Sequence, residues 1–415
     1  MLLYTLSQTA VFALRHSNGT SYENQSFWGL RLFFRTRNAR LLCVFSMPPA
    51  SLDYRFPAEW EPHAATWLAW PHRWKTWPGK FEPIPPLYAL LVRTLAKHEP
   101  VHVLAGGDAV MAEAKRLVGG VLNVTLHDIP TNDAWIRDFG PMFLAARGER
   151  IQGEAKTVAR SPHPSPLPEG EGDVDNHSET PPALVDWEYN AWGGKYPPFD
   201  SDNAAPSKIA ARLGRRRFTP GIILEGGSID GNGRGTLLTS EQCLLNPNRN
   251  PHLTREQIEK YLANYCGTKK VLWLGGGIVG DDTDGHVDEL ARFVSPTTVV
   301  AAVEQNPSDV NYAALADNFR RLQTMTDQDG RPLDVVPLPL PGPIVYAGQR
   351  LPASYCNFYI ANGVVLVPQF DDPADRAAFD TLARFFPGRE LVGLPARDLV
   401  WGRGGFHCIT QQQPA

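Results

Sequence analysis

The chain has 415 residues, and its 40 lysines and arginines against 44 aspartates and glutamates give a net charge of −4 at pH 7. This balance argues against a nucleic acid or an anionic membrane as the partner. Hydrophobic residues make up 43% of the chain and charged residues 20%, which is the profile of a globular protein and not of a disordered or fibrous one.

Two segments differ in composition from the rest. Residues 1–46 contain five arginines and one acidic residue, without a lasting helix or strand period. They are either a transit peptide or, the interpretation we favour, an over-long start with Met47 as the true first residue. Residues 161–182 contain six prolines and only two large apolar residues, so we expect a disordered surface insert. Residues 47–415 should otherwise form a single domain.

The remaining chain alternates short apolar runs with helical segments. Strands are predicted at four β-branched runs bounded by Gly, Pro or Asn: 100–105, 270–274, 297–303 and 363–368. Helices are predicted where apolar residues recur with helical spacing: 87–97, 254–265, 310–325 and 374–386. Thr254 and Gln257 form a capping box at the start of the second helix. The alternation predicts a repetitive α/β fold.

Cysteine usage indicates a reducing compartment. The chain has an odd number of cysteines and no Cys-x-x-Cys pair: Cys43, Cys243, Cys266, Cys356 and Cys408. Such spacing argues against a disulfide scaffold and against a zinc ribbon. No uninterrupted apolar stretch approaches the ~18 residues of a transmembrane helix. We therefore expect a cytoplasmic protein without a membrane partner.

Residues with reactive side chains gather in four glycine-rich clusters, each at the end of an expected strand or in the following turn: 135–141, 225–228, 282–288 and 404–408. From such turns a rigid scaffold can direct side chains into a shared cleft. The sequence contains neither a Gly-x-Gly-x-x-Gly fingerprint nor a Walker sequence. This argues against nucleotide chemistry.

Cys408 is the candidate nucleophile. A lone cysteine is more often an inert buried residue, but His286 and several carboxylates supply the base and the orienting groups that thiol catalysis needs. His407 is adjacent to Cys408 and would point the opposite way if the segment were extended. We therefore expect His286 to be the base.

Asp284, His286 and Asp288 leave a second interpretation open. On an extended segment the three side chains share one face, which suits metal ligands as well as acid–base chemistry. The spacing is similar to half of the dimetal site of arginase-like ureohydrolases. Their second half, a Ser-Phe-Asp-x-Asp type segment, is absent from the sequence, and a metal would leave Cys408 without a role. We expect no metal.

Asp138 and Asp288 indicate the chemical class of the substrate. Two carboxylates in one cleft beside a thiol suit a guanidinium or an amidine, because carboxylates accept paired hydrogen bonds from such a fork of N–H donors. Trp135 and Trp70 are candidates to stack on this cation. The alternative for Asp138 is a local salt bridge with Arg137 or a turn cap.

Seven motifs occur in a characteristic order along the chain: 59–71, 135–141, 224–228, 243–251, 283–288, 352–359 and 407–412. In this order they resemble the agmatine deiminases, a branch of the guanidine-modifying pentein superfamily that also includes the bacterial peptidylarginine deiminases. The resemblance extends from about residue 56 to residue 414. It implies the pentein fold, a single-domain, five-bladed pseudo-symmetric α/β propeller with the active site at its axis.

The resemblance also implies a reaction and a set of roles. Agmatine is hydrolysed to N-carbamoylputrescine and ammonia, in polyamine biosynthesis, through a covalent amidino-cysteine intermediate and without a metal or organic cofactor. The implied site residues are Cys408 as nucleophile, His286 as acid and base, Asp138 and Asp288 as guanidinium ligands, and Glu225, Trp135 and Asp282 as further substrate-binding residues. The partner would be a small guanidinium compound, and a homo-oligomer is compatible with this reading.

Asp282 bears on the choice of substrate. The resemblance places it at the distal amine, where its charge would attract the ammonium of agmatine and repel the α-carboxylate of arginine. The loop 402–408 departs from the usual Gly-Gly-Gly-Asn-Ile-His-Cys at Arg403, Gly405 and Phe406. A deiminase of peptidyl-arginine or of another arginine derivative is therefore the alternative. A third class, a protein that binds a cationic amine without turnover, would need no nucleophile.

Deleting residues 1–46, or separately residues 161–182, should leave the melting temperature and the catalytic turnover nearly unchanged. Neither segment has the apolar content to join a core. Thermal unfolding of the two shortened proteins, followed beside the full chain, checks this. A loss of several degrees for either deletion would contradict the prediction.

Overall fold

Strands and helices alternate along the chain, which confirms the mixed α/β class. The computed structural model describes residues 47–146 and 181–415. The expected extension 1–46, and the expected insert 161–182 except for its last two residues, lie outside the described residues. The described residues from Pro48 onward belong to one compact unit. In this part of the chain, no helix has the length and apolar character needed to cross a membrane.

Five sheets in the described residues share one pattern of strand pairing. In each, one strand pairs antiparallel with one neighbour and parallel with another, and a helix lies in the chain between the two parallel strands. The sheets, in spatial order, are β19 (Gln411–Pro414), β2 (His63–Ala69), β3 (Val101–Leu104) and β4 (Val124–His127); β1 (Tyr54–Arg55), β5 (Met142–Ala146), β6 (Ala183–Val185) and β7 (Arg217–Phe218); β8 (Asp230–Gly231), β9 (Thr236–Ser240) and β10 (Lys270–Leu274); β11 (Ala291–Phe293), β12 (Thr298–Val303) and β13 (Asp334–Pro339); and β16 (Tyr359–Ile360), β17 (Val364–Gln369) and β18 (Glu390–Pro395). A separate hairpin consists of β14 (Val345–Tyr346) and β15 (Gln349–Arg350).

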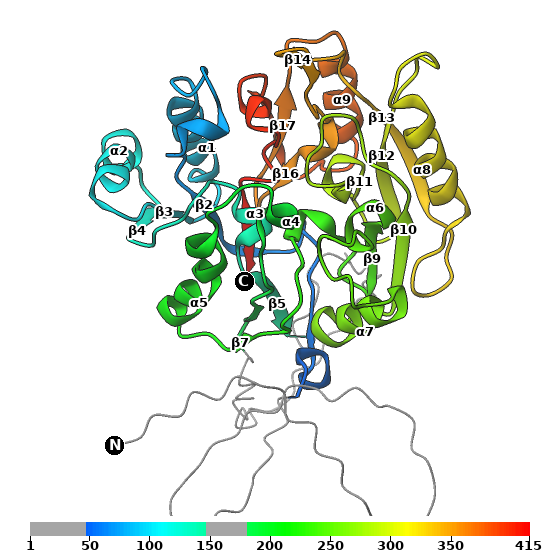
Figure 1. Cartoon of the computed structure of the whole chain (residues 1–415), viewed down its shortest axis with the longest axis horizontal. Coiled ribbons are helices and arrows are strands. Elements are labelled where there is room, and N and C mark those ends of the chain that lie inside the picture. The colour runs from blue at the N-terminus through cyan, green and yellow to red at the C-terminus, as the bar shows by residue number, and fades with distance from the viewer. Residues whose placement is uncertain (1–46, 147–180) are drawn as a thin grey trace, which may run out of the picture. The chain divides into compact units, whose positions relative to one another are not determined.

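The helices connect and cover these sheets. The α-helices are α1 (Ile84–Leu95), α2 (Asp108–Val118), α3 (Ile136–Phe139), α4 (Ala191–Gly194), α5 (Asp200–Leu213), α6 (Glu241–Leu244), α7 (Arg255–Cys266), α8 (Tyr312–Thr324) and α9 (Ala374–Ala383). Short 3-10 helices are η1 (Pro49–Leu52), η2 (Trp74–Thr76), η3 (Gly226–Ser228), η4 (Val287–Glu289), η5 (Tyr355–Asn357) and η6 (Leu399–Gly402). Figure 1 shows α2, α5, α7 and α8 at the periphery and α3 near the middle.

Most of the elements predicted from the sequence are confirmed. The four predicted strands are β3, β10, β12 and β17, and the four predicted helices are α1, α7, α8 and α9, with ends that differ by up to three residues. The capping box is present, since Thr254 Oγ1 accepts from the Gln257 N–H at 3.3 Å and Gln257 Oε1 accepts from the Thr254 N–H at 2.8 Å. The helices α2 and α5 were not predicted. The first buries only Ala114 and Val118, and the second contains Pro206, so both lack a clear helical signal.

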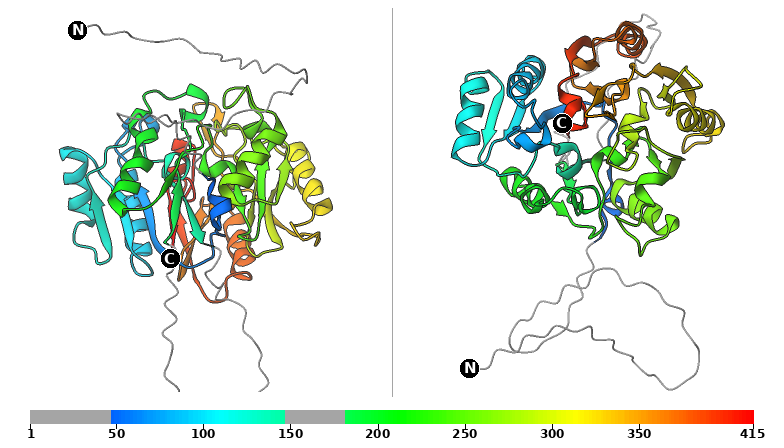
Figure 2. Two further views of the ribbon diagram at one scale, coloured as in Figure 1. Left: turned by 90° about the horizontal axis from the view of Figure 1, so that it is seen from below. Right: turned by 45° about the horizontal axis from the view of Figure 1, so that its top comes forward.

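The centre of the sheets is where distant segments meet. In the right view of Figure 2 the sheets follow one another around a centre that holds the C-terminal segment. There α3 contacts η3, and η3 contacts η4. The Arg137 N–H of α3 donates to the Cys408 carbonyl at 3.1 Å, and β19 pairs antiparallel with β2. The glycine-rich clusters of the sequence are thereby brought together.

Beneath this centre, Glu59 is the hub of a buried charge network. Its Oε2 lies 2.8 Å from His407 Nε2, 2.9 Å from Arg292 Nη2 and 3.4 Å from Arg137 Nη2. Its Oε1 accepts the Ile360 N–H at 2.8 Å. Burial alone would raise the pKa of Glu59, but the charges of Arg292, His407 and Arg137 hold this pKa below its usual range. One carboxylate therefore connects four segments that are far apart in the sequence.

Glu59→Gln should lower the free energy of unfolding by about 3 to 5 kcal/mol, because it leaves buried arginines without their counter-ion. Since the native pKa of Glu59 is depressed, its contribution should be fully present above the ordinary value of 4.5 and should be lost as the pH falls through the native pKa. Urea unfolding at several pH values measures both effects. The control is Glu390→Gln, whose side chain is 64% exposed and should have little effect. Equal losses for the two variants would contradict the network's role.

Candidate active site

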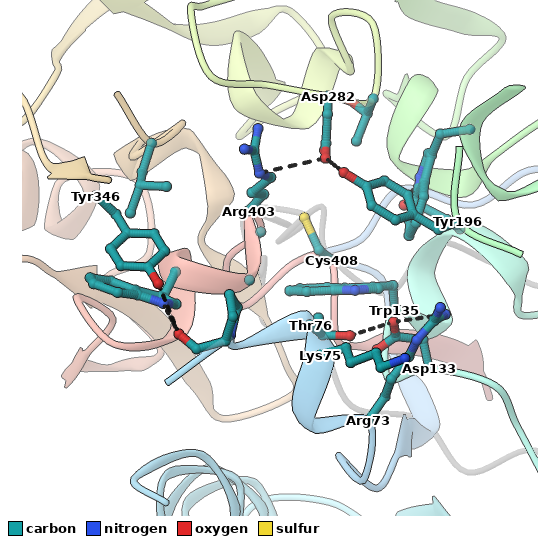
Figure 3. Close-up of a pocket in the computed structure, with 18 of the residues that line it drawn as sticks. Arg73, Lys75, Thr76, Asp133, Trp135, Tyr196, Asp282, Tyr346, Arg403 and Cys408 are labelled. Carbon is teal, nitrogen blue, oxygen red and sulfur yellow. Dashed lines mark hydrogen bonds and ion pairs between the residues drawn. The ribbon is translucent and has the colours of Figure 1, made fainter. Parts of the chain in front are cut away.

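A cavity of about 430 Å³ lies beside α3 and the segment that leads into β19 (Figure 3). Four of the predicted site residues line it: Trp135, Asp138, Asp282 and Cys408. The other three are buried and are not among the lining residues: Glu225, His286 and Asp288. The structure therefore distributes the predicted residues between the cavity wall and the protein immediately around it.

Asp138 is held by two N–H donors. Its Oδ1 accepts the Gly227 N–H at 2.9 Å, and its Oδ2 accepts Trp192 Nε1–H at 2.9 Å. Burial raises the pKa of Asp138 to about 6, although the nearby His286 opposes the rise. Arg137 pairs with Glu59 and not with Asp138, so the alternative of a local salt bridge is wrong.

Asp138, His286 and Asp288 converge on one point at Gly227. A Cβ atom at Gly227 would lie 2.6 Å from His286 Nδ1, 2.8 Å from Asp138 Oδ1 and 3.0 Å from Asp288 Oδ2. His286 Nδ1 is 3.6 Å from Asp138 Oδ1. Burial disfavours the charged imidazole, yet the negative charge of Asp138 raises the pKa of His286 well above its usual value. Only glycine leaves these three groups room to meet.

The segment that carries His286 and Asp288 is a turn and not a strand. Asp284 and Gly285 have positive φ angles of 69° and 86°, and η4 begins one residue after His286. The Asp284 carboxylate is directed to Arg249, with 2.6 Å between Oδ2 and Nη1. The predicted face of three metal ligands is therefore wrong, because it assumed an extended segment.

Cys408 has acidic neighbours. Its Sγ lies 3.7 Å from Asp288 Oδ2 and 4.0 Å from Glu289 Oε1, and Asn357 Nδ2 donates to it at 3.2 Å. Burial, reinforced by these two carboxyl groups, raises the pKa of the Cys408 thiol well above its usual value. In the empty site the sulfur is therefore a thiol.

His407 lies closer to the site than the sequence indicated. Residues 406–409 form a turn, so the condition of an extended segment is not met. His407 Nδ1 is 2.7 Å from Asp288 Oδ2, and its Nε2 is 2.8 Å from Glu59. Although burial opposes it, this hydrogen bond holds the pKa of Asp288 below its usual value. Asp288 Oδ1 is buried without a hydrogen-bond partner and remains free to accept one.

Trp135 forms one wall of the cavity and packs on Trp77, with 5.5 Å between ring centroids. A Cβ atom at Gly404 would lie 2.5 Å from the Trp135 ring, and one at Gly402 would lie 2.6 Å from the Trp77 ring. The nucleophile loop can approach these rings because it has glycine at both positions. Trp70 does not line the cavity, and its Nε1–H donates to Glu113.

Glu225 lies next to His286. Its Oε1 accepts from Arg249 Nε at 2.7 Å, and its Oε2 is buried without a hydrogen-bond partner. A Glu225 oxygen, the Cys243 sulfur and a ring nitrogen of His286 lie within 4.8 Å of one another. Glu225 therefore faces the imidazole and does not line the cavity.

In the described part of the chain, two groups of three residues have donor atoms close enough to hold a metal ion: Glu225 with Cys243 and His286, and Asp288 with Glu289 and Cys408. Carboxylate, thiolate and imidazole are ligands that suit zinc. However, a metal at either place would occupy His286 or Cys408, which thiol chemistry requires free.

Asp282 lines the cavity but already has partners. Its Oδ2 accepts a short hydrogen bond from the Tyr196 hydroxyl and lies 3.7 Å from Arg403 Nε. Burial raises the pKa of Asp282, while Tyr196 and Arg403 oppose the rise. Figure 3 shows this pair on one side of Cys408 and Trp135 on the other.

No pattern in the sequence marked Trp192, Tyr196 or Asn357 as site residues. Trp192 reaches Asp138 because Ala191, Trp192, Gly193 and Gly194 all have positive φ angles, so the adjacent glycines were the available signal. Asn357 falls within a recognised motif, yet its contact with Cys408 depends on how the chain folds back.

Comparison with known proteins places the chain in a family. Residues 55–414 match the model for the Porphyromonas-type peptidyl-arginine deiminases. A curated agmatine deiminase of Pseudomonas aeruginosa is 38% identical over 391 residues, which cover 88% of this chain and 97% of that protein. One from Pseudomonas savastanoi is 36% identical and covers 90% and 99%.

Solved structures agree. The agmatine deiminase of Enterococcus faecalis is 32% identical, with a TM-score of 0.78 over 89% of this chain and 98% of that one. The C. jejuni agmatine deiminase is 29% identical, with a TM-score of 0.71 over 87% and 96%. The sequence, the fold and the order of the site residues along the chain thus lead to one conclusion: this protein belongs to the Porphyromonas-type peptidyl-arginine deiminase family.

Proposed function

We propose that the protein is an agmatine deiminase, which hydrolyses agmatine to N-carbamoylputrescine and ammonia. The observation that carries the proposal is the convergence of Asp138, His286 and Asp288 at Gly227, with the Cys408 sulfur 3.7 Å from Asp288. The relatives named agmatine deiminases support the choice of substrate. Formation of N-carbamoylputrescine places the reaction in polyamine synthesis.

Binding is the first step. The guanidinium of the substrate is held between Asp138 and Asp288, and Asp288 Oδ1 is a buried acceptor without a partner in the described residues. Each carboxylate accepts N–H bonds from one edge of the planar cation. Trp135 provides an aromatic wall for the rest of the substrate.

Activation follows from charge. Two carboxyl groups near Cys408 keep it protonated in the empty site. A bound guanidinium offsets this negative charge, so it lowers the thiol pKa and the proton is released to water. The thiolate then attacks the guanidinium carbon. The nucleophile is thus generated by the substrate that it attacks.

His286 serves both half-reactions. Its pKa is raised, so it begins as an imidazolium and protonates the departing nitrogen, which leaves as ammonia. The remaining amidino group is bound to Cys408. The neutral imidazole then takes a proton from water, which attacks the same carbon and releases the ureido product with the sulfur as leaving group. Glu225, beside His286, orients the ring.

We further infer that the five sheets are the blades of a pseudo-symmetric propeller with the cavity at its axis. The repeated pairing pattern and the central position of α3 support this arrangement. On the same basis residues 47–415 form the catalytic domain. The net charge of −4 and the cysteine pattern support a cytoplasmic enzyme that takes a small guanidinium compound and no nucleic acid.

Incubation with agmatine should release ammonia and N-carbamoylputrescine, at a rate that EDTA does not change. The reaction needs only the thiol, the imidazole and the carboxylates described above. Ammonia assay and mass spectrometry of the products check this. Release of urea, or activity that depends on added manganese, would favour a ureohydrolase, and binding without any product would favour an amine-binding protein.

His286→Asn should form the cysteine adduct slowly and then stall, because the second half-reaction lacks a base for water. Intact-mass spectrometry after mixing with agmatine should show the adduct. Cys408→Ser is the matched control and should show none, because a hydroxyl is far less ionised than a thiol near neutral pH. The role of His286 in hydrolysis is contradicted if its variant never accumulates the adduct while single-turnover ammonia release continues.

A further inference from the structure

Asp282 does not face the cavity as an isolated carboxylate. Its Oδ2 lies 3.7 Å from Arg403 Nε, and both residues line the same cavity as Cys408. Figure 3 shows Arg403, Asp282 and Tyr196 as a connected row beside Cys408. A carboxylate that is paired with a guanidinium presents no net negative charge to a ligand, so the expected repulsion of an α-carboxylate is removed at this place.

Arg403 is fixed in position. Its Nη1 donates to the Gly280 carbonyl at 3.1 Å, and its Nη2 donates to Gln349 Oε1 at 2.7 Å. Its φ angle of 72° is unusual for a residue with a side chain and costs on the order of 1 kcal/mol or more. A strained residue next to the nucleophile points to a function that requires its side chain.

The arginine is also the one long side chain that the nucleophile loop offers to the cavity. Its neighbours Gly402 and Gly404 also line the cavity, and each is pressed against a tryptophan ring with no room for a Cβ atom. A guanidinium has five N–H donors, and the two hydrogen bonds described use only two of them. The side chain is 31% exposed, so the remaining donors can meet a ligand.

We propose that Asp282 and Arg403 together recognise an ammonium group and a neighbouring carboxylate, so that the protein also deiminates free guanidino α-amino acids such as arginine. The ammonium pairs with Asp282, and the carboxylate pairs with Arg403, for which a planar fork of donors is well suited. This inference rests on the proposed deiminase chemistry of Cys408. It replaces the expectation, based on Asp282 alone, that the α-carboxylate is rejected.

The rest of the cavity wall is compatible with a carboxylate. Arg73 lies 3.8 Å from Asp133, so these two lining charges offset each other as Arg403 and Asp282 do. Lys75 also lines the cavity, and the described residues give it no ion pair; its ammonium lies 5.7 Å from the Trp74 ring centroid. The lining outside the guanidinium ligands therefore carries an uncompensated positive charge.

The chemistry balances as it does for agmatine. Cys408 Sγ forms a bond to the guanidinium carbon, one C–N bond breaks, and ammonia leaves with a proton from His286. Water then adds to the carbon, the C–S bond breaks, and the products are citrulline and the free thiol. No oxidant, reductant or further reactant is required.

Four guanidines separate the two contacts: agmatine and arginine amide carry the ammonium alone, Nα-acetylarginine carries the carboxylate alone, and arginine carries both. For the wild type, kcat/KM for arginine should exceed that for Nα-acetylarginine and for arginine amide. Arg403→Gln and Arg403→Gly should each lower the ratio of arginine to agmatine kcat/KM by about 10-fold to 100-fold, the value of one buried charged contact. Glycine suits the φ angle at this position, so the second variant is not at risk of misfolding.

Arg376→Gln is the matched control, because this arginine is 83% exposed on α9 and does not line the cavity; its ratio should equal that of the wild type. If the wild type turns over agmatine but not arginine, or if neither Arg403 variant changes the ratio, the recognition by Asp282 and Arg403 is refuted while the deiminase assignment stands. If no guanidine is turned over at all, the proposed function itself fails. Turnover of Nα-acetylarginine equal to that of arginine would show that the carboxylate alone is recognised, as in a peptide C-terminus, and would overturn the ammonium contact.

Discussion

The buried carboxylate of Glu59 is the interaction on which the rest of the structure depends. It comes from the turn before β2, and it joins Arg137 of α3, Arg292 of β11 and His407 of the nucleophile loop. Each of these partners adjoins a group of the site. Arg137 precedes Asp138, and His407 precedes Cys408 and contacts Asp288. Because buried charges require their counter-ions, the network fixes these backbone segments relative to one another.

Above this network the site concentrates negative charge around a thiol. Such an arrangement keeps the sulfur unreactive while the cavity is empty, since burial and two carboxyl groups oppose thiolate formation. A cation that fits between Asp138 and Asp288 reverses this balance. Selectivity for guanidines therefore arises in the activation of the nucleophile as well as in binding. A neutral electrophile that enters the cavity would meet a protonated cysteine.

The sequence was sufficient for the α/β class, for eight elements and for the residues that meet at the centre. Local signals explain this success, because β-branched runs, helical spacing and the capping box at Thr254 act over a few residues. It was insufficient for the paths of the turns. The segment around His286 was taken as extended, whereas positive φ angles at Asp284 and Gly285 send Asp284 to Arg249. Partners from distant segments, such as Trp192 at Asp138 or Arg403 at Asp282, depend on tertiary folding and leave no local pattern.

The pairing of β19 with β2 has a consequence for synthesis of the protein. Cys408 lies three residues before β19, and β19 hydrogen-bonds to a strand formed more than 340 residues earlier in the chain, at Gln411 and Trp67. A ribosome has therefore produced every other part of the site before the nucleophile emerges, and the sulfur reaches its place only when β19 has docked. Incomplete chains on the ribosome contain the binding carboxylates but no positioned thiol, so catalysis begins only after translation has passed the last strand described here.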